Sequence, residues 1–248
     1  EEQISEICNY LDLSHVDDII KSAVPDSILS NIPLSLTETI SERDVITNLR
    51  AIRERNKVYK SMIGMGYNGT LMPAVIKRNV LENPAWYTAY TPYQAEISQG
   101  RLEALLNYQQ MVIDLTGMEL ANASLLDEAT AAAEAMAMCK RISKSKSNRF
   151  FVDQECHPQT IAVVKTRARY FDIDIVIGDA SVVMDYSDLF GSLLQYPGTS
   201  GKVMNIEPVI AKLHEHDALV CVASDLLSLL LLKPPGEMGA DVVLGNSQ

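Results

Sequence analysis

The sequence predicts an α/β fold whose core is a mostly parallel sheet with helices on both faces. Between residues 147 and 244, short apolar segments alternate with amphipathic helical segments. Parallel strands joined by helical crossovers are the simplest explanation of this alternation. An alanine-rich helical run comes just before it, and a polar, helix-prone stretch comes before both. With 248 residues, of which 47% are hydrophobic, the chain can bury a core of ordinary size.

The first element is a helical arm, which we place at residues 1–75. Ser41 offers an N-cap for a helix that runs through Val45 and Ile52. The large α/β domain follows as residues 76–248, and Pro73 introduces a short helix at its beginning.

Two irregular segments follow the first helices. Three glycines within residues 64–69 indicate tight turns of the backbone. Their spacing matches the letters of a dinucleotide-binding loop, but Pro73 breaks the helix that such a loop requires, so we set this interpretation aside. Residues 83–94 combine four aromatic residues with two prolines. Loops of this composition line a site or pack against a neighbouring chain.

Regular structure is expected from Gly100 onward, where leucines recur at helical spacing. The alanine-rich run is a strong helix former, and Asp127 and Glu128 at its beginning suit the positive end of a helix. Strands are expected at residues 149–153, 173–177, 193–196, 219–224 and 241–244, with helices at residues 159–170 and 206–216 between them.

Composition excludes several classes of protein. The formal net charge is −11, which argues against nucleic acid as a main partner because phosphate neutralisation needs clustered Lys and Arg. The longest apolar run, residues 226–232, is too short to span a bilayer. No N-terminal targeting signal is visible, so we expect a soluble, already mature chain.

The four cysteines predict neither disulfides nor a metal site, because they are far apart and form no C-x-x-C pair. We expect buried thiols in a reducing compartment, with Cys156 as a partly exposed exception. The sequence leaves open whether Cys139, Cys156 or Cys221 confers redox control.

Three polar residues fall where ligands bind in such a sheet, beyond the carboxyl ends of the strands or at a helix start. Pyridoxal phosphate needs a flat side chain against its ring, a carboxylate at the ring nitrogen, a helix start for the phosphate and a lysine for the Schiff base. His157 after a strand offers the flat side chain, Asp225 after a later strand offers the carboxylate, and Thr130 lies at a helix start. His157 can equally be a core or helix-capping residue, and Asp225 an N-cap.

The lysine is missing from this arrangement. The sequence reaches Gln248 near the place where it is expected, and Lys233, directly before two prolines, is a poor candidate.

Several long motifs resemble the P proteins of the glycine cleavage system. The resemblance covers roughly residues 40–248, with one departure at Ala129, where the family usually has glycine. The motifs that carry it are Ile63–Tyr67, Glu82–Thr88, Tyr90–Arg101, Asn122–Glu128, Cys156–Thr160, Tyr196–Thr199 and Lys233–Glu237.

This resemblance implies a fold of the aspartate-aminotransferase type, in chains built from two homologous halves. The chain matches the first, non-catalytic half, with its small domain missing, and the second half would bind pyridoxal phosphate. Thr130, His157 and Asp225 would then be vestigial cofactor positions. The active-site loop that this half presents to the other would comprise Tyr90, Thr91, Pro92, Tyr93, Gln94 and Ser98.

The resemblance also implies an activity and a setting. The complete enzyme, expected to be a dimer, would decarboxylate glycine and pass the aminomethyl group to the lipoyl-bearing H protein. The likeness to the long eukaryotic form implies the mitochondrial matrix. The alternative is a catalytically inactive structural or regulatory fragment.

Overall fold

The computed structural model describes residues 1–30, 32, 34–182 and 187–247. Gln248, the residue expected near the lysine position, lies outside the described residues. Contacts along the backbone divide the chain into two compact units, Glu1–Lys60 and Ser61–Gln248, which we describe separately. In the described part of the chain, no helix is both long and apolar enough to cross a membrane.

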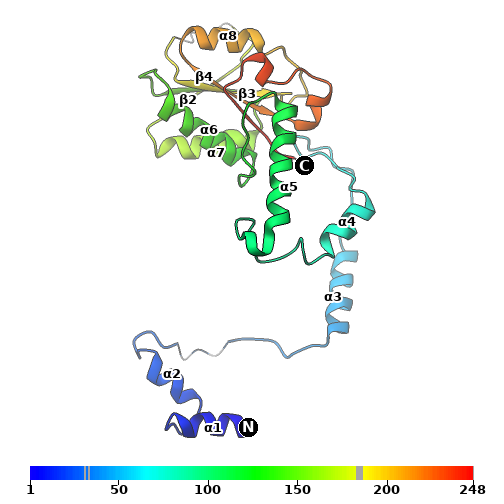
Figure 1. The fold of residues 1–248 in the computed structure, drawn as a ribbon, viewed down its shortest axis with the longest axis vertical. Coiled ribbons are helices and arrows are strands. Elements are labelled where there is room, and N and C mark those ends of the chain that lie inside the picture. Colours follow the sequence, from blue (N-terminus) through cyan, green and yellow to red (C-terminus); the bar gives the residue numbers. More distant parts are fainter. Residues whose placement is uncertain (31, 33, 183–186, 248) are drawn as a thin grey trace. The chain divides into compact units, whose positions relative to one another are not determined.

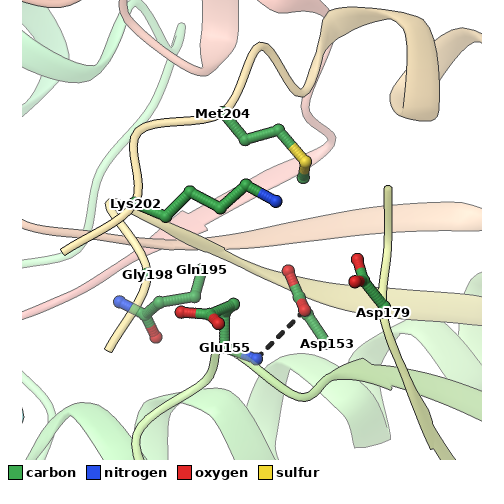
Figure 2. A pocket seen from close by; sticks show the side chains of 7 residues that line it. All are labelled: Asp153, Glu155, Asp179, Gln195, Gly198, Lys202 and Met204. Carbon is green, nitrogen blue, oxygen red and sulfur yellow. Dashed lines mark hydrogen bonds between the residues drawn. The ribbon is translucent and has the colours of Figure 1, made fainter. Parts of the chain in front are cut away.

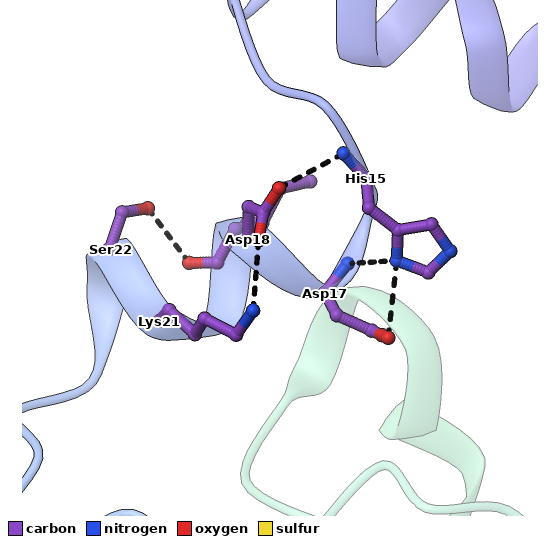
Figure 3. Close-up of polar contacts among 6 residues, drawn as sticks. His15, Asp17, Asp18, Lys21 and Ser22 are labelled. Carbon is purple, nitrogen blue, oxygen red and sulfur yellow. Dashed lines mark hydrogen bonds and ion pairs between the residues drawn. The ribbon is translucent and has the colours of Figure 1, made fainter.

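The first unit is helical. It contains α1 (Glu2–Tyr10), α2 (Asp17–Ala23) and α3 (Glu42–Glu54). Ser41 caps α3, because its hydroxyl accepts a hydrogen bond from the Asp44 N–H at 3.2 Å. At the beginning of α2, Asp18 pairs with Lys21 at 3.0 Å (Figure 3). The hydrogen bond from Lys21 lowers the pKa of Asp18.

The second unit contains a five-stranded parallel sheet in the order β2-β1-β3-β4-β5. The expected strands are confirmed, and their ends differ from the expected ones by no more than two residues. The bounds are β1 (Arg149–Asp153), β2 (Asp174–Gly178), β3 (Gly191–Tyr196), β4 (Leu219–Ser224) and β5 (Val242–Leu244).

Helices cover both faces of this sheet, as predicted. One face packs against α6 (Glu128–Ile142) and α7 (Pro158–Arg169), and its core includes Phe150 and Met136. The other packs against α8 (Glu207–Glu215) with Ile210 and Leu213. Figure 1 shows α6 and α7 on one side of the strands and α8 on the other. The alanine-rich face of α6 lets the helix approach the sheet closely.

Two further helices lead into this layer structure. They are α4 (Ala74–Leu81) and the long α5 (Ala95–Thr116), which has a non-helical kink at Ser98. Gly117 ends α5 in the left-handed conformation and packs against the short 3₁₀ helix η2 (Gly236–Met238). At 1.5 Å per residue, the 22 residues of α5 span about 33 Å. The helix therefore separates the aromatic loop before it from η2.

The leucine-rich segment after Asp225 forms a short 3₁₀ helix, η1 (Leu226–Leu230), and two prolines soon follow it. One local expectation is wrong. Cys156 is 1% exposed rather than partly exposed, since it packs under the sheet edge with its thiol 3.8 Å from the Leu193 carbonyl. All four cysteines are free and buried, and burial agrees with the expectation for Cys8, Cys139 and Cys221.

Candidate functional site

The carboxyl ends of the parallel strands carry a concentration of polar side chains. Asp153 ends β1, Asp179 follows β2 and Asp225 follows β4. The backbone N–H of Asp225 donates to the Tyr196 carbonyl at the end of β3, which ties the ends of these two strands together. This edge is where ligands bind in open α/β sheets. It is therefore the place to test the predicted cofactor positions.

His157 lies at this edge, directly before α7, and is 8% exposed. Its Nδ1 is 2.8 Å from the hydroxyl oxygen of Thr199, which belongs to the loop after β3. Burial lowers the pKa of His157 and so favours the neutral imidazole. The ring is thus a fixed, buried group, which agrees with the core-histidine alternative of the sequence analysis.

Hydrogen bonds hold the loop after β3 against the segment that follows β1. The carboxylate of Glu155 accepts hydrogen bonds from the Ser200 hydroxyl at 2.7 Å and from the Ser200 N–H at 3.0 Å. These bonds lower the pKa of Glu155. Gly198 lies so close to Glu155 that a β-carbon at this position would overlap its carboxylate.

A small pocket lies beside the contact between Glu155 and the loop after β3. Figure 2 shows its lining of carboxylates and one lysine, and its volume is about 10 Å³. That is room for about one water molecule and far too little for a cofactor ring. The lining residues are Asp153, Glu155, Asp179, Gln195, Gly198, Lys202 and Met204.

The beginning of α6 is strongly acidic. Asp127 caps the helix, and its carboxylate accepts a hydrogen bond from the Thr130 N–H at 2.7 Å. The next residue, Glu128, has one buried carboxylate oxygen without a hydrogen-bond partner. Burial, then the nearby charges of Asp225 and Asp127, raise the pKa of Glu128. Burial also raises the pKa of Asp153.

These features do not fit pyridoxal phosphate. A phosphate group at the α6 terminus would replace the Asp127 cap and face the carboxylates of Glu128 and Asp225. Asp225 instead caps η1 by accepting a hydrogen bond from the Leu227 N–H at 3.1 Å, as its alternative interpretation requires. Within the described residues, the hydrogen bonds of Thr130, His157 and Asp225 go to other partners and do not join the three.

The predicted active-site loop lies at the beginning of α5. The N–H and hydroxyl of Thr91 both bond to the Gln94 side chain, and Arg101 donates to the Tyr90 carbonyl at 2.5 Å. Tyr93 is 80% exposed, whereas Ser98 is buried with its hydroxyl lacking a partner. The loop is thus internally braced while an aromatic side chain faces outward. Pro92 lies between Thr91 and Tyr93 and is half-buried.

Sequence reasoning missed the groups that organise this edge. Thr199 ends the Tyr196–Thr199 motif, but the sequence gives no sign that Thr199 contacts His157 or that Ser200 contacts Glu155. Glu128 could have been recognised from the sequence. It lies at a predicted helix start, where the strand-end residue Asp225 can bring a second negative charge close to it. Over the described residues, no group of three or more His, Cys, Asp or Glu side chains is arranged to hold a metal ion.

Replacing Glu128 by glutamine is expected to stabilise the chain at pH 7 by about 1 kcal/mol or less, since partial solvent exposure weakens the effect. The raised pKa means that Glu128 favours folding below its ordinary pKa of 4.5 and that this contribution is lost as pH rises through the folded-state pKa. The gain in Glu128→Gln should therefore appear at pH 7 and vanish near pH 3.5. Urea denaturation at both pH values measures it. Glu215→Gln, at the exposed end of α8, is the control, and a loss of stability at pH 7 would contradict the expectation.

Comparison with known proteins identifies the family. The sequence profile described as "Glycine cleavage system P-protein" matches residues 1–248. Glycine dehydrogenase (decarboxylating) 2 of Pseudomonas fluorescens is 61% identical over 93% of this chain and 24% of its own length. The Stutzerimonas stutzeri glycine dehydrogenase (decarboxylating) is 58% identical over 96% of this chain and 25% of its length.

A solved structure agrees with these matches. The crystal structure of a glycine decarboxylase (P-protein) of the glycine cleavage system, in inhibitor-bound form, superposes with a TM-score of 0.87 at 30% identity. It covers 99% of this chain, which in turn covers 56% of that chain. The expected fold class is thereby confirmed. The chain spans about a quarter of the length of the curated relatives it matches.

One implication of the resemblance is wrong. The relatives come from Pseudomonas, Stutzerimonas and Agrobacterium, so they contradict the expected eukaryotic form and its mitochondrial location. Bacterial relatives match 93–99% of this chain at 54–61% identity, so the family resemblance alone does not separate bacterial from eukaryotic forms. The matches over the whole chain and the shared fold establish that the chain belongs to the glycine cleavage system P-protein family.

Proposed function

We propose that this chain is the first part of a glycine dehydrogenase (decarboxylating), which decarboxylates glycine and transfers the aminomethyl group to the lipoyl-bearing H protein. The observation that carries the proposal is the match to enzymes of this name at 54–61% identity over 93–99% of the chain. Because the carboxyl edge of this sheet does not fit pyridoxal phosphate, we assign cofactor binding to the second half of the complete protein. This half supplies walls of the active site, and the complete protein is a dimer.

The braced loop from Tyr90 to Gln94 is the part of this chain that we assign to the active site. Its aromatic side chains are exposed, with Tyr90 at 47% and Tyr93 at 80%. Such side chains can cover a site formed with another chain and exclude water from it. The hydroxyl of Tyr93 can donate a hydrogen bond to the glycine carboxylate. The side chains of Gln94 and Arg101 hold the loop backbone, because Gln94 accepts a hydrogen bond from the Thr91 N–H and Arg101 donates one to the Tyr90 carbonyl.

In the complete enzyme, Tyr93→Phe is expected to lower glycine turnover or glycine affinity by about tenfold or more, the loss that follows removal of a hydrogen bond to a charged group. Steady-state kinetics with glycine and lipoylated H protein measures both parameters. Tyr170→Phe is the matched control, because Tyr170 is equally exposed, at 79%, but lies at the end of α7. If Tyr93→Phe behaves like Tyr170→Phe, the active-site role of the loop is excluded.

A second candidate function is that of an inactive structural or regulatory element. The acidic beginning of α6 and the small pocket at the sheet edge favour it, since both leave this half without a place for the cofactor. Turnover assays of the complete protein and of residues 1–248 distinguish the candidates. Activity confined to the complete protein and sensitive to Tyr93 supports the first, whereas insensitivity to every loop substitution supports the second.

A further inference from the structure

The turn formed by Gly64, Met65 and Gly66 lies directly on His157. A β-carbon built on Gly66 would be 2.8 Å from the His157 Nε2 and within 3.7 Å of two further ring atoms. Only a glycine backbone can approach the imidazole this closely. The turn comes about ninety residues earlier in the sequence than His157, so its position there is a feature of tertiary structure.

The backbone of this turn is unusual. Gly64, Met65 and Gly66 are all left-handed, with φ values of 66°, 56° and 81°. The Tyr67 N–H donates to the Gly64 carbonyl at 3.1 Å and closes the turn. A methionine in this conformation costs free energy, and such residues persist only where the surroundings determine the backbone strongly.

Those surroundings come from two other segments at the sheet edge. Gln159, in the first turn of α7, donates from Nε2 to the Met65 carbonyl at 2.9 Å. Thr199, after β3, holds the His157 ring through Nδ1 at 2.8 Å and so directs its Nε2 side toward Gly66. Each bond is partly buried, which strengthens it relative to a bond in water.

We propose that the Gly64–Tyr67 turn fills the place at the carboxyl ends of the strands where a ligand would otherwise bind. His157 is a positioning residue that holds the turn there. The residue that the sequence suggests as a vestigial ring-stacking position therefore has a present role. It orients a piece of backbone where an active copy would hold a ligand. This inference goes beyond the proposed function, because it concerns a contact within this chain and predicts no change in the reaction.

Hydrogen exchange of the Tyr67 amide in the 248-residue chain tests the contact. His157→Ala and the milder Thr199→Val should each accelerate this exchange by about tenfold or more, as expected when a local opening becomes easier. Thr199→Ser keeps the hydroxyl, so exchange of the Tyr67 amide should stay as slow as in the wild-type chain. Amides of α8 should not change in any of these variants, which separates local release of the turn from general destabilisation.

His214→Ala is the matched control, since His214 binds Asp241 at 2.8 Å, away from the Gly64–Tyr67 turn. If Thr199→Val leaves Tyr67 exchange at the wild-type rate, His157 does not hold the turn and the proposal is wrong. The result for the turn is independent of enzymatic activity, so failure of this proposal and failure of the proposed function are distinguishable.

A binding measurement tests the second part of the proposal. Pyridoxamine 5′-phosphate is the probe, because it resembles the cofactor but cannot form Schiff bases with surface lysines. In equilibrium dialysis, the 248-residue chain should retain none of it. Retention of one equivalent, together with faster exchange of the Tyr67 amide, would show that a ligand displaces the turn and would overturn the proposal.

Discussion

Gly236→Ala is expected to lower the free energy of unfolding by about 2–3 kcal/mol, the upper part of the range seen when extra atoms are forced into a packed interior. A β-carbon on Gly236 would overlap the Gly117 carbonyl oxygen and crowd that of Thr116. These are backbone atoms at the end of α5, so they cannot rotate away as a side chain would. Either α5 or η2 must move. Urea denaturation of the 248-residue chain measures the loss.

Gly100→Ala is the matched control for this prediction. Gly100 lies inside α5, and a β-carbon added to it would have no neighbouring atom within 4 Å. Alanine there should stabilise the helix by about 0.5–1 kcal/mol, because glycine loses more backbone entropy on folding. The two substitutions add the same methyl group, and their effects should have opposite signs. Equal effects would show that the contact between Gly117 and Gly236 carries no energetic weight.

Periodicity predicts the sheet because the central strands β1, β3 and β4 are buried on both faces. The apolar stretches within Leu219–Ser224 and Arg149–Asp153 are bounded by polar residues, and the bounds predicted for both strands agree with the structure. Helix ends are less well defined. The pattern predicts a helix over residues 159–170 where α7 spans Pro158–Arg169, because the first and last turns have few apolar residues to fix their limits.

Side-chain partners at the site could not be predicted in the same way. The position of His157 after β1 follows from the strand pattern, but its contact with Gly66 depends on a turn about ninety residues away. The bond between His157 and Thr199 depends likewise on strand order. Neither leaves a periodic signal. The capping role of Asp225 was predictable as an alternative, because it depends on the two residues that follow.

Phe150→Ala should cause the largest loss of stability, about 3–5 kcal/mol, the range for truncating a buried phenylalanine. Phe150 is fully buried in β1, and its ring centroid lies 5.3 Å from that of Phe190. Gly191 closes the space beside it, since a β-carbon on Gly191 would lie 3.1 Å from the Phe150 ring. The surrounding strands and helices pack against this ring and cannot collapse fully into the cavity.

Phe150→Ala should also destabilise the edge of the sheet that carries His157. β1 ends at Asp153 and leads into His157, so a cavity in β1 weakens the strand that positions the polar segment. Urea denaturation measures the global effect, and Phe171→Ala is the control, because Phe171 is 52% exposed after α7 and should cost under about 1 kcal/mol. If Phe150→Ala and Phe171→Ala lower the free energy of unfolding equally, the core between the sheet and helices α6 and α7 does not stabilise the chain. The residues at the sheet edge would then be held by packing on the α8 face.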